Sequence, residues 1–599
     1  NFKVSDVFEK DLTGKHLPID TKYFKDLELE ILNQFDDLDK SLDGWLIKSE
    51  NYQALNTILP KFKEKVQTIY IDPPYNTGND GFLYKDSYQS SSWLTFIHNR
   101  LEISKRLLRR DGVIFVSIAN NANYYKESYK LSLILDSLFN KRFADLIWKR
   151  RSASGSYVIS DITEIHEYIL CWGSEEAYIH KNIIGYDKLK DYKYKDEQGI
   201  FKWHDLVIHQ YTKEERPNLY YGVVYNFKEN KLDFDKDPIT VDTSKEIVIY
   251  PSIDGKSVFT MTKKSMKEVY ERGVIGVAKE SDKYKIKIKK YLEDNRGIII
   301  GDPLKSILDE NKWKHKIGGT DEATKEVKNL FNDSKFNTAK PTNLIELLMY
   351  ASTLKNTLIL DFFTGSGTTA HAVMKLNKED GGKRKFILVE MAYYFDTVII
   401  PRIKKVAYSF NWKEGKPQDT DGTGIFLKYH TLEQYEDSLE NIEFEKQNEL
   451  SFELPDYFVK YMLEWETKNS NTFLNLESLK NPFNYKLKII ENYQQKEVKT
   501  DVIETFNYLL GLNVSRYKVL EDNGKKYVFV FGKKSEKNVA VVWRSIESID
   551  LEKDKEIIEN NIKDFNPDEI YINGDAIVKG FKVIESLLRT LMFDRMEAK

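Results

Sequence analysis

The sequence predicts an α/β fold that is interrupted by a long insert and followed by an α+β domain. Apolar runs rich in β-branched residues alternate with amphipathic helical patterns over residues 41–177 and again over 337–410, as in a sheet that is covered by helices. Residues 178–336 lose this alternation and are dense in Lys, Asp and Tyr. Residues 411–599 contain separate strand and helix patterns. We therefore expect a mixed sheet, of about seven strands, that is assembled from two distant parts of the chain.

The composition allows several sizeable cores and gives no global basic signal. The chain has 599 residues, of which 41% are hydrophobic, and a net charge of −3; a local basic groove would still suffice for nucleic acid. The single cysteine, Cys171, lies in an apolar run and is expected in the core, so neither a disulfide framework nor a thiolate metal cluster can form within the chain, and no metal site is predicted. No apolar run reaches about 18 residues, and no signal-peptide pattern is present. We expect a cytoplasmic protein without a membrane partner.

The first 177 residues contain most of the expected sheet. Residues 1–40 predict a helical leader that packs on another part of the protein or on a second subunit. The expected strands that follow are 45–48, 66–71, 113–118, 143–148 and 166–170, and the expected helices are 51–59, 93–108 and 125–139. Strands that alternate with helices in this way predict an α/β sheet.

The stretch 66–78 carries the most informative motif. An apolar strand ends in Asp72-Pro73-Pro74-Tyr75, where two prolines fix φ and remove two N–H donors. The motif therefore forms a rigid loop at the carboxyl end of a strand, where open α/β sheets bind ligands. Asp72 and the Pro73 carbonyl can accept the two hydrogens of an exocyclic amine, and Tyr75 can stack on its ring. A structural Pro-rich turn is the alternative, but the complete tetrapeptide favours a site for an amino-bearing base.

A second motif follows the expected strand 357–360. Gly365-Ser366-Gly367 predicts a glycine turn that lets a ligand approach the backbone and opens a helix. Glu390 ends the next expected strand, where a carboxylate can accept both ribose hydroxyls of a nucleoside. The third glycine of the dinucleotide fingerprint is absent. A nucleoside without phosphates, such as S-adenosylmethionine, therefore fits better than a dinucleotide.

Two basic features are candidates for contact with a nucleic-acid backbone. Four lysines of the insert alternate with apolar or aromatic residues, which puts them on one face of an expected strand. Two arginines precede a small polar loop at 152–157. The lysines are Lys283, Lys285, Lys287 and Lys289, and the arginines are Arg150 and Arg151. Phosphate contact and a solvated surface are both open interpretations of each feature.

The motifs and their order resemble the β class of DNA amino-methyltransferases. Asp in the first place of Asp-Pro-Pro-Tyr is typical of the adenine-N6 enzymes of that class, in which the catalytic loop precedes a target-recognition insert and then the cofactor motif. The resemblance implies a circularly permuted, Rossmann-like methyltransferase sheet with 178–336 as the target-recognition domain. The catalytic residues that it implies are Asp72, Pro73, Pro74 and Tyr75. The cofactor-binding residues that it implies are Lys340, Pro341, Thr342, Asn343, Asp361, Phe362, Phe363, Gly365, Ser366, Gly367, Thr368 and Glu390. Plain core positions are the alternative for the two phenylalanines.

The resemblance extends to the methylation subunit of type III restriction–modification systems. The segments that carry it are 69–78, 93–96, 166–170, 365–373 and 504–512. It implies a homodimer on double-stranded DNA and a possible separate restriction subunit. The chain itself has no Gly-x-x-x-x-Gly-Lys-Ser/Thr phosphate loop. The family usually has acidic residues where this chain has Ala119-Asn120-Asn121-Ala122, so their role is open here.

We therefore predict a DNA adenine-N6 methyltransferase that uses S-adenosylmethionine and flips its target base. A cytosine-N4 or RNA methyltransferase is the alternative enzyme, and a non-catalytic DNA-recognition subunit for a nuclease partner is the alternative from another class. Residues 411–599 contain no catalytic constellation, because Glu497-Val498-Lys499 lacks an upstream Pro-Asp partner of the nuclease type. The expected helix 581–592 has a wide apolar face. It must be buried on its own domain, a second copy or a partner subunit, which predicts an assembly domain.

Overall fold

The computed structural model describes most of the chain. The described ranges are 18–25, 27–76, 88–119, 127–151, 165–180, 190–280, 283–292, 303–311, 313–333, 336, 338–442, 470, 472, 474–491 and 494–593. These residues form two compact units, the larger from 1–179, 305–309 and 316–599 and the smaller from 180–304 and 310–315. The polar loop at 152–157 and residues 120–122 lie outside the described residues.

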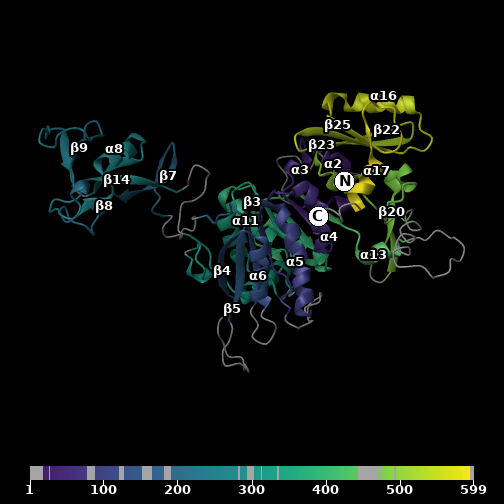
Figure 1. Ribbon diagram of the computed structural model, residues 1–599, viewed down its shortest axis with the longest axis horizontal. Coiled ribbons are helices and arrows are strands. Elements are labelled where there is room, and N and C mark those ends of the chain that lie inside the picture. The colour runs from purple at the N-terminus through teal and green to yellow at the C-terminus, as the bar shows by residue number, and fades with distance from the viewer. Residues whose placement is uncertain are drawn as a thin grey trace, which may run out of the picture. The chain divides into compact units, whose positions relative to one another are not determined.

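The larger unit is organised around an eight-stranded mixed sheet (Figure 1). In sheet order its strands are β19 (Leu427–Thr431), β1 (Gly44–Lys48), β16 (Lys385–Glu390), β15 (Leu358–Asp361), β2 (Val66–Ile71), β3 (Leu108–Ile118), β5 (His166–Gly173) and β4 (Lys141–Lys149). Neighbouring strands from β19 to β3 are parallel, and β5 is antiparallel to both β3 and β4. The predicted mixed α/β sheet is therefore present.

The predicted count of about seven strands is wrong by one. The additional strand, β19, lies at the edge beside β1, with Gly44 opposite Leu427. It comes from the segment that we assigned to the C-terminal region. All five of its residues are half-buried or exposed, so it lacks the apolar run by which the buried strands are recognised.

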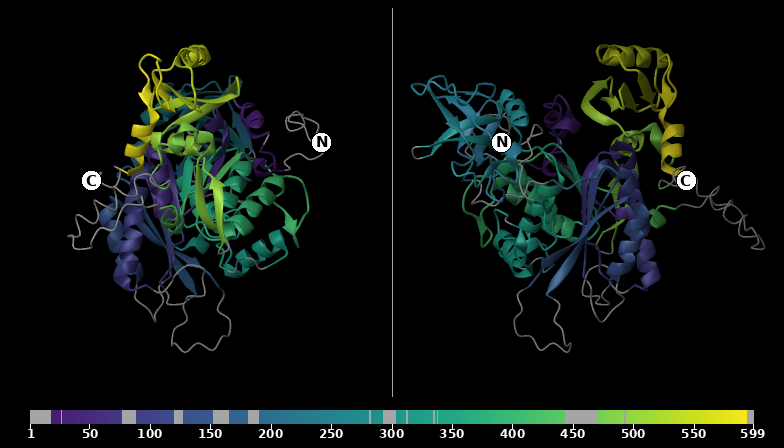
Figure 2. Two further views of the ribbon diagram at one scale, coloured as in Figure 1. Left: turned by 90° about the vertical axis from the view of Figure 1, so that its right-hand side faces the viewer. Right: turned by 60° about the vertical axis from the view of Figure 1, so that its left-hand side comes forward.

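Helices cover both faces of this sheet (Figure 2). One layer consists of α4 (Asn51–Phe62), α5 (Ser90–Leu107) and α6 (Glu127–Leu138), and the other of α10 (Thr342–Ser352), α11 (Thr368–Asp380) and α12 (Ile400–Tyr408). Ile97 and Leu101 of α5 pack in one buried cluster with Ile69 and Ile114 of the sheet. On the other face, Thr68 of β2 lies within hydrogen-bonding distance of Ser352 at the end of α10. Both faces are thus closed, as a parallel sheet requires.

The strands β15 and β2 mark the point where the direction of winding reverses. After β2 the chain passes through α5 to β3 on one side, and after β15 it passes through α11 to β16 on the other. Such a reversal opens a crevice beyond the carboxyl ends of the two strands, which is the usual ligand site of open α/β sheets. Both predicted motifs begin where these strands end.

The smaller unit has its own sheets and its own core. Its elements are β6 (Tyr194–Asp196), β7 (Gly199–Asp205), β8 (Val207–Ile208), β9 (Val223–Asn226), β10 (Lys231–Asp233), β11 (Glu246–Ile249), β12 (Val258–Phe259), α8 (Lys263–Glu271), β13 (Ile275–Glu280) and β14 (Lys283–Tyr291). Val223, Phe259, Met266 and Ile286 contribute to its buried cluster. Residues 316–336, which we placed in the insert, belong to the larger unit and include α9 (Thr320–Phe331).

The C-terminal domain is built on a five-stranded sheet, β22 to β26. Its elements are α15 (Val502–Leu510), β22 (Asn513–Asp522), β23 (Lys525–Lys534), β24 (Lys537–Arg544), α16 (Leu551–Ile562), β25 (Glu569–Ile572), β26 (Lys582–Val583) and α17 (Ile584–Phe593). One stripe of the predicted apolar face of the last helix is buried, because Ile584 and Leu588 lie in the core of this domain. Leu587 and Leu591 of the other stripe are half-buried, and Val583 belongs to β26 and is exposed. The leader is also held within the chain, since Asp20 contacts Lys404 and Tyr429.

Candidate active site

The carboxyl ends of β15 and β2 border a cavity of about 280 Å³, near the lower end of the range for ligand pockets. Both predicted motifs contribute to its lining. The predicted residues that line it are Asp72, Pro74, Lys340, Asp361, Phe362, Phe363, Gly365, Ser366, Thr368 and Glu390. The structure therefore brings together two motifs that are far apart in the sequence.

Buried partners hold the Asp-Pro-Pro-Tyr loop, which we call the target loop (residues 72–75). The indole N–H of Trp93, a fully buried residue of α5, donates to the Pro74 carbonyl at 2.8 Å. The chain then turns at Asn76, which has a positive φ of 58°, a conformation that Asn tolerates. The Asn76 side chain donates to Glu127 at 3.1 Å and accepts the Tyr88 N–H at 2.7 Å. These contacts fix the direction in which the loop leaves the sheet.

The side chains of the target loop form a compact charged cluster. Lys340 Nζ lies 2.6 Å from Asp72 Oδ2, and the Tyr75 hydroxyl donates to Asp72 Oδ1 at 2.7 Å. Glu167 Oε2 lies 3.1 Å from the Tyr75 hydroxyl and 3.5 Å from Lys340 Nζ. Burial opposes the charge of Lys340, but the two carboxylates raise its pKa above the usual value, so the ammonium is charged. Burial and the same carboxylates hold the pKa of Tyr75 well above its usual value, so its hydroxyl is a donor.

The backbone conformation of the glycine turn requires glycine at two positions. Gly365 has φ +57° and Gly367 has φ +79°, values that a side chain strains. A Cβ added at Gly367 would meet Ile399 at 3.5 Å, an ordinary contact distance. The Gly367 N–H donates to the Thr364 carbonyl at 3.1 Å, and α11 begins at the next residue. Replacement is therefore costly mainly because of φ.

Two carboxylates flank the glycine turn inside the cavity. Glu390 accepts the N–H groups of Gly365 and Met391 at 3.0 and 2.9 Å. Asp361 is fully buried and accepts the Thr369 hydroxyl at 2.5 Å. Burial raises the pKa of Asp361 to about 7, and the neighbouring carboxylates add to this shift against the opposing hydrogen bonds. Together with Asp72, these groups make a cavity lined with acids, which favours a cationic ligand.

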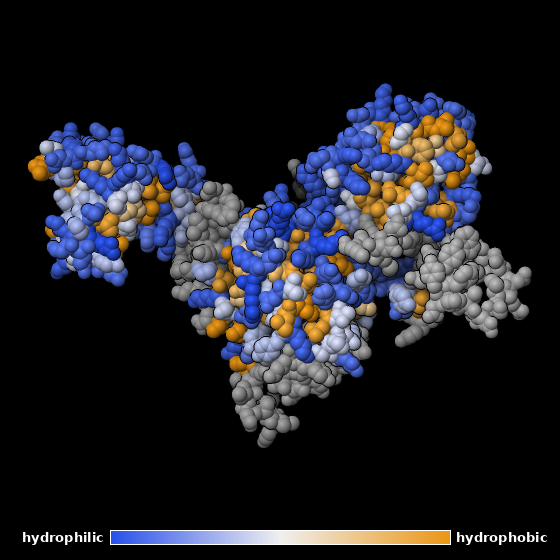
Figure 3. Space-filling view, viewed as in Figure 1, coloured by the Kyte–Doolittle hydropathy of each residue, from blue (hydrophilic) through white to orange (hydrophobic). Residues whose placement is uncertain are grey.

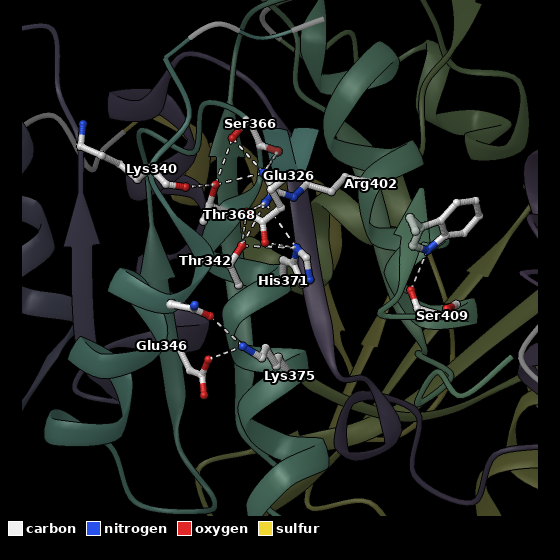
Figure 4. A network of polar contacts seen from close by, with 12 residues as sticks. Glu326, Lys340, Thr342, Glu346, Ser366, Thr368, His371, Lys375, Arg402 and Ser409 are labelled. Carbon is white, nitrogen blue, oxygen red and sulfur yellow. Dashed lines mark hydrogen bonds and ion pairs between the residues drawn. The ribbon is translucent and has the colours of Figure 1, made fainter. Parts of the chain in front are cut away.

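A buried arginine holds the glycine turn from behind (Figure 4). Arg402 of α12 is fully buried, and its guanidinium donates to Ser366 Oγ and Thr368 Oγ1, each at 3.0 Å. It also lies 3.3 Å from Glu326 of α9 and donates to His371 Nδ1 at 3.3 Å. Burial and Arg402 hold the pKa of His371 well below its usual value, so the ring is neutral and can accept this bond. A single side chain thus ties the turn to two helices.

Comparison with known families identifies the protein class. The model of an N6/N4-type DNA methylase family matches residues 66–399, which include the target loop, the insert and the glycine turn. The chain belongs to this DNA methylase family. The matched range contains both motifs that meet in the cavity, so the family assignment and the geometry concern the same part of the chain.

Individual relatives of this methylase family cover part of the chain. The chain is 32% identical to the Mod subunit of the type III restriction–modification enzyme EcoPI from Escherichia phage P1, over 62% of this chain and 60% of that protein. It is 29% identical to the EcoP15I Mod subunit from Escherichia coli, over 59% of each chain. It is also 29% identical to the type II methyltransferase M.KpnI from Klebsiella pneumoniae, over 56% of this chain and 77% of that protein. The matched region thus spans about three fifths of the type III relatives.

Solved structures of DNA methyltransferases are less similar to this chain than the relatives above. The complex of M1.HpyAVI with S-adenosylmethionine is 12% identical and covers 60% of this chain and 99% of that chain, with a TM-score of 0.28. The cytosine-N4-specific PvuII methyltransferase is 10% identical and covers 61% of this chain and 86% of that chain, with the same score. The fold assignment therefore rests on the sheet order described above. Among the described residues, no helix is long and apolar enough to cross a membrane.

Some predicted site residues lie beside the cavity and not in its lining. They are Pro73, Tyr75, Pro341, Thr342, Asn343 and Gly367. Thr342 donates to Glu326 at 2.7 Å and so belongs to the network behind the turn. Asn343 donates to the Lys316 carbonyl at 2.8 Å. Lys340, which we assigned to the cofactor, points its ammonium at the target loop.

Sequence reasoning missed several residues of this site. Glu167 is a carboxylate within an apolar strand pattern, and that contrast is the signal that could have found it. Glu50 and Asn51 follow the first strand and line the cavity, together with Arg100 of α5. Arg100 lies 2.5 Å from Glu50 Oε1, and Asn51 donates to the Phe362 carbonyl at 3.0 Å. Only the fold brings these residues to the cavity.

The predicted DNA contacts have partners of their own within the chain. Lys285 and Lys289 lie 2.8 and 2.7 Å from Glu280 and Asp196, respectively. Lys287 is buried and lies 2.8 Å from Asp205, and Lys283 is exposed. Phosphate contact by this strand stays a prediction. Arg150 lies 3.7 Å from Glu167 and Arg151 is exposed, so one of the two arginines faces the charged cluster.

Proposed function

We propose that the chain is a DNA methyltransferase that transfers a methyl group from S-adenosylmethionine to the N6 amine of a flipped adenine. The observation that carries this proposal is the single cavity that joins the target loop to the glycine turn. Family membership supports methyl transfer to an amino group of DNA. Asp72 in the first place of the loop motif favours adenine over cytosine.

The lining of the cavity fits S-adenosylmethionine. This cofactor is a cationic nucleoside that supplies an activated methyl group. The carboxylates Asp361 and Glu390 favour its positive charge, and the Phe363 ring offers an apolar wall near the target loop. Glu390 already accepts backbone N–H groups, and a carboxylate oxygen has a further lone pair for a ribose hydroxyl. The glycine turn leaves the backbone between these groups accessible to the ligand.

The target loop would hold and activate the base. Asp72 and the Pro73 carbonyl accept the two hydrogens of the amine, which keeps the nitrogen lone pair off the ring. Tyr75 offers its ring for stacking. With the cofactor bound, the N–C bond would form as the bond between the methyl group and the cofactor's sulfur breaks, and the Asp72 carboxylate would stabilise the positive charge that develops on the nitrogen. The amine would then release one proton to water, and N6-methyladenine and S-adenosylhomocysteine would leave. The structure of the loop thus supplies positioning and charge, which are the main requirements of this step.

A labelling experiment tests the activity and separates the alternatives. Purified protein is incubated with methyl-labelled cofactor and duplex DNA, and the nucleosides are then separated after digestion. Label in N6-methyladenine supports the proposal, whereas label in N4-methylcytosine or in an RNA substrate supports the alternative enzymes. DNA binding without any incorporation would favour the non-catalytic recognition subunit. Sequencing of the methylated positions then gives a cognate duplex.

The names of the type III relatives suggest partners for the chain. We propose that the smaller unit recognises the target sequence in duplex DNA. Because the type III relatives are Mod subunits of restriction–modification enzymes, we also propose that a separate subunit would do the cutting if this enzyme restricts DNA. Such an enzyme would work on chromosomal DNA in the cytoplasm.

The predicted homodimer also stays a proposal. Helix α17 supports it less than the sequence suggested, because Ile584 and Leu588 are buried within its own domain and Leu587 and Leu591 are half-buried there. Hydrophobic residues nevertheless gather on the visible face of the C-terminal domain (Figure 3), and a second copy could cover such a surface. Light scattering at micromolar concentration would show twice the 70.3 kDa of the monomer if the proposal is correct. A constant monomer mass with and without DNA would contradict it.

A further inference from the structure

Both oxygens of the Asp72 carboxylate are already engaged by the protein's own donors. Lys340 Nζ lies 2.6 Å from one oxygen, and the Tyr75 hydroxyl lies 2.7 Å from the other. The side chains of Asp72 and Lys340 are 25% and 10% exposed, so water screens this pair little. A target amine that is to be held by Asp72 must therefore share the carboxylate with these donors or replace one of them.

A second carboxylate lies within reach of the same ammonium. Glu167 Oε2 is 3.5 Å from Lys340 Nζ, and the Glu167 side chain is 8% exposed. The other oxygen of Glu167 lies 3.7 Å from Arg150 Nη1. Lys340 thus stands between two acids, and a small rotation of its side chain changes which of them it contacts more closely.

The backbone of Lys340 belongs to the cofactor side of the cavity. Its carbonyl accepts the Thr368 hydroxyl at 3.3 Å, and Figure 4 shows this carbonyl directed at Thr368 while the ammonium points away. The backbone can stay anchored beside the glycine turn while the side chain moves. This arrangement suits a group that changes partners within the site.

We propose that Lys340 is a displaceable counter-ion of Asp72 and that Glu167 takes over the ammonium when the target amine binds. This inference rests on the proposed methyl transfer to an amine. Lys340 and Glu167 are therefore positioning residues that act through Asp72. The movement of the Lys340 ammonium from Asp72 to Glu167 needs no additional reactant, since only a hydrogen-bond partner is exchanged.

The reaction explains why the ammonium must leave Asp72. The amine nitrogen gains positive charge as it bonds to the methyl group, and a second cation on the same carboxylate would repel it. Moving Lys340 to Glu167 keeps the ammonium neutralised and frees Asp72 for the developing charge.

Removal of Lys340 therefore has a specific consequence for the pH dependence. Asp72 and Glu167 both contact the Tyr75 hydroxyl, at 2.7 and 3.1 Å, but that hydroxyl has one proton to donate. Without the ammonium, this pair is expected to bind an additional proton, as adjacent carboxylates do. The other titratable groups that act on this cluster are Tyr70, Asp361 and Arg150. They are unchanged in the variants proposed below.

The test compares pH profiles of single-turnover methyl transfer on the cognate duplex. Lys340→Met is expected to move the acidic limb of the profile up by about one pH unit. The double variant Lys340→Met/Glu167→Gln is expected to move it back toward the wild-type position, because only one carboxylate then remains. Lys340→Arg retains a cation and is expected to retain the profile. Lys383→Met replaces an exposed lysine and serves as the matched control.

Glu167→Gln alone provides a second test that retains the Lys340–Asp72 pair. The displaced ammonium then has no second acid to move to, so kcat is expected to fall about tenfold or more, whereas cofactor affinity measured by calorimetry is unchanged. This variant also covers the case in which Lys340→Met fails to fold.

Several results would overturn the inference. An acidic limb that is the same in Lys340→Met as in the wild type would reduce Lys340 to a structural ion-pair partner. A limb that is shifted equally in the single and double variants would exclude Glu167 as the second acid. A kcat in Glu167→Gln that equals the wild-type value would also exclude Glu167 as the second acid. If the wild-type protein transfers no methyl group to any duplex, the proposed function fails instead, and the two failures are thus distinguishable.

Discussion

The target loop and the glycine turn begin at the ends of adjacent strands and line one cavity, yet different forces hold them. Ions hold the side chains of the loop, since Asp72 is engaged by Lys340 and Tyr75. Backbone conformation holds the turn, with φ +79° at Gly367 and the buried Arg402 behind it. An ion contact can pass to a ligand, whereas a left-handed glycine cannot change without refolding the turn. The cofactor half is therefore preformed, and the target half can exchange partners.

The largest effect is expected from a substitution in the target loop, whose contacts can be exchanged. Asp72→Ala should abolish methyl transfer, because no carboxylate then stabilises the charge on the amine. Cofactor affinity measured by calorimetry should survive, since the turn and Glu390 are untouched. Asp564→Ala replaces an exposed aspartate of the C-terminal domain and is the control. Wild-type turnover in Asp72→Ala would contradict the catalytic role that we assign to the target loop.

The second prediction concerns substitutions in the glycine turn, which is preformed. Gly367→Val should reduce cofactor binding below detection, because a β-branched residue strongly disfavours positive φ and the turn must rearrange; Gly365→Val is expected to act in the same way. Gly381 is a matched control, since it has φ +68° at the other end of α11 and no atom within 4 Å of an added Cβ. Gly381→Val should therefore lower stability but leave cofactor affinity unchanged. Equal cofactor affinity in Gly367→Val and the wild type would place the cofactor elsewhere.

The third prediction concerns the support behind the turn. Arg402→Met should lower the free energy of unfolding by about 3 kcal/mol, because it leaves Glu326 without its buried cation and removes bonds to Ser366 and Thr368. Cofactor affinity should fall as well, since the turn loses its anchor. Arg402→Lys keeps the charge but cannot reach both sides of the network, so we expect an intermediate loss. Chemical denaturation and calorimetry measure the two effects, and a normal affinity in a destabilised variant would limit Arg402 to folding.

The two halves also differ in how much of them the sequence predicts. The target loop and the glycine turn are local signals, because their prolines and glycines act on the backbone within a few residues. Glu167, Lys340 and Arg402 acquire their roles only through contacts between distant segments, and no pattern along the chain encodes which carboxylate an ammonium will meet.

The strands show the same division between local and tertiary signals. β2 and β15 are apolar and buried, whereas the edge strand β19 is polar and was missed. The apolar face of α17 was recognised correctly, but the sequence could not show that its own domain buries Ile584 and Leu588 and covers Leu587 and Leu591 in part.

The fourth prediction uses pH to compare the carboxylates. Burial raises the pKa of Asp361 to about 7, so the folded protein holds this proton more tightly than the unfolded chain does. Its contribution to the free energy of unfolding is therefore largest at low pH and falls as pH rises from about 4 to about 7, by up to about 1.4 kcal/mol per pH unit. Asp361→Asn should remove that decrease in denaturation curves measured between pH 5 and 8. A cationic cofactor should bind more tightly to the wild type as pH rises through about 7, because Asp361 becomes charged. The same pH trend in Asp361→Asn would show that Asp361 is not the group responsible.

The smallest expected effect concerns the lysines of β14 in the smaller unit. Each phosphate contact there must compete with an acid of the same unit, since Lys285 and Lys289 contact Glu280 and Asp196. If these lysines nevertheless reach the DNA backbone, Lys285→Ala/Lys289→Ala should weaken cognate and non-cognate DNA alike. The slope of log affinity against log salt should then fall by about one per lost contact. Lys533→Ala/Lys534→Ala removes two exposed lysines of the C-terminal domain and controls for net charge. An unchanged slope in the β14 variant would mean that its lysines serve the internal ion pairs of the strand, and the backbone contacts of the insert would then have to come from other residues.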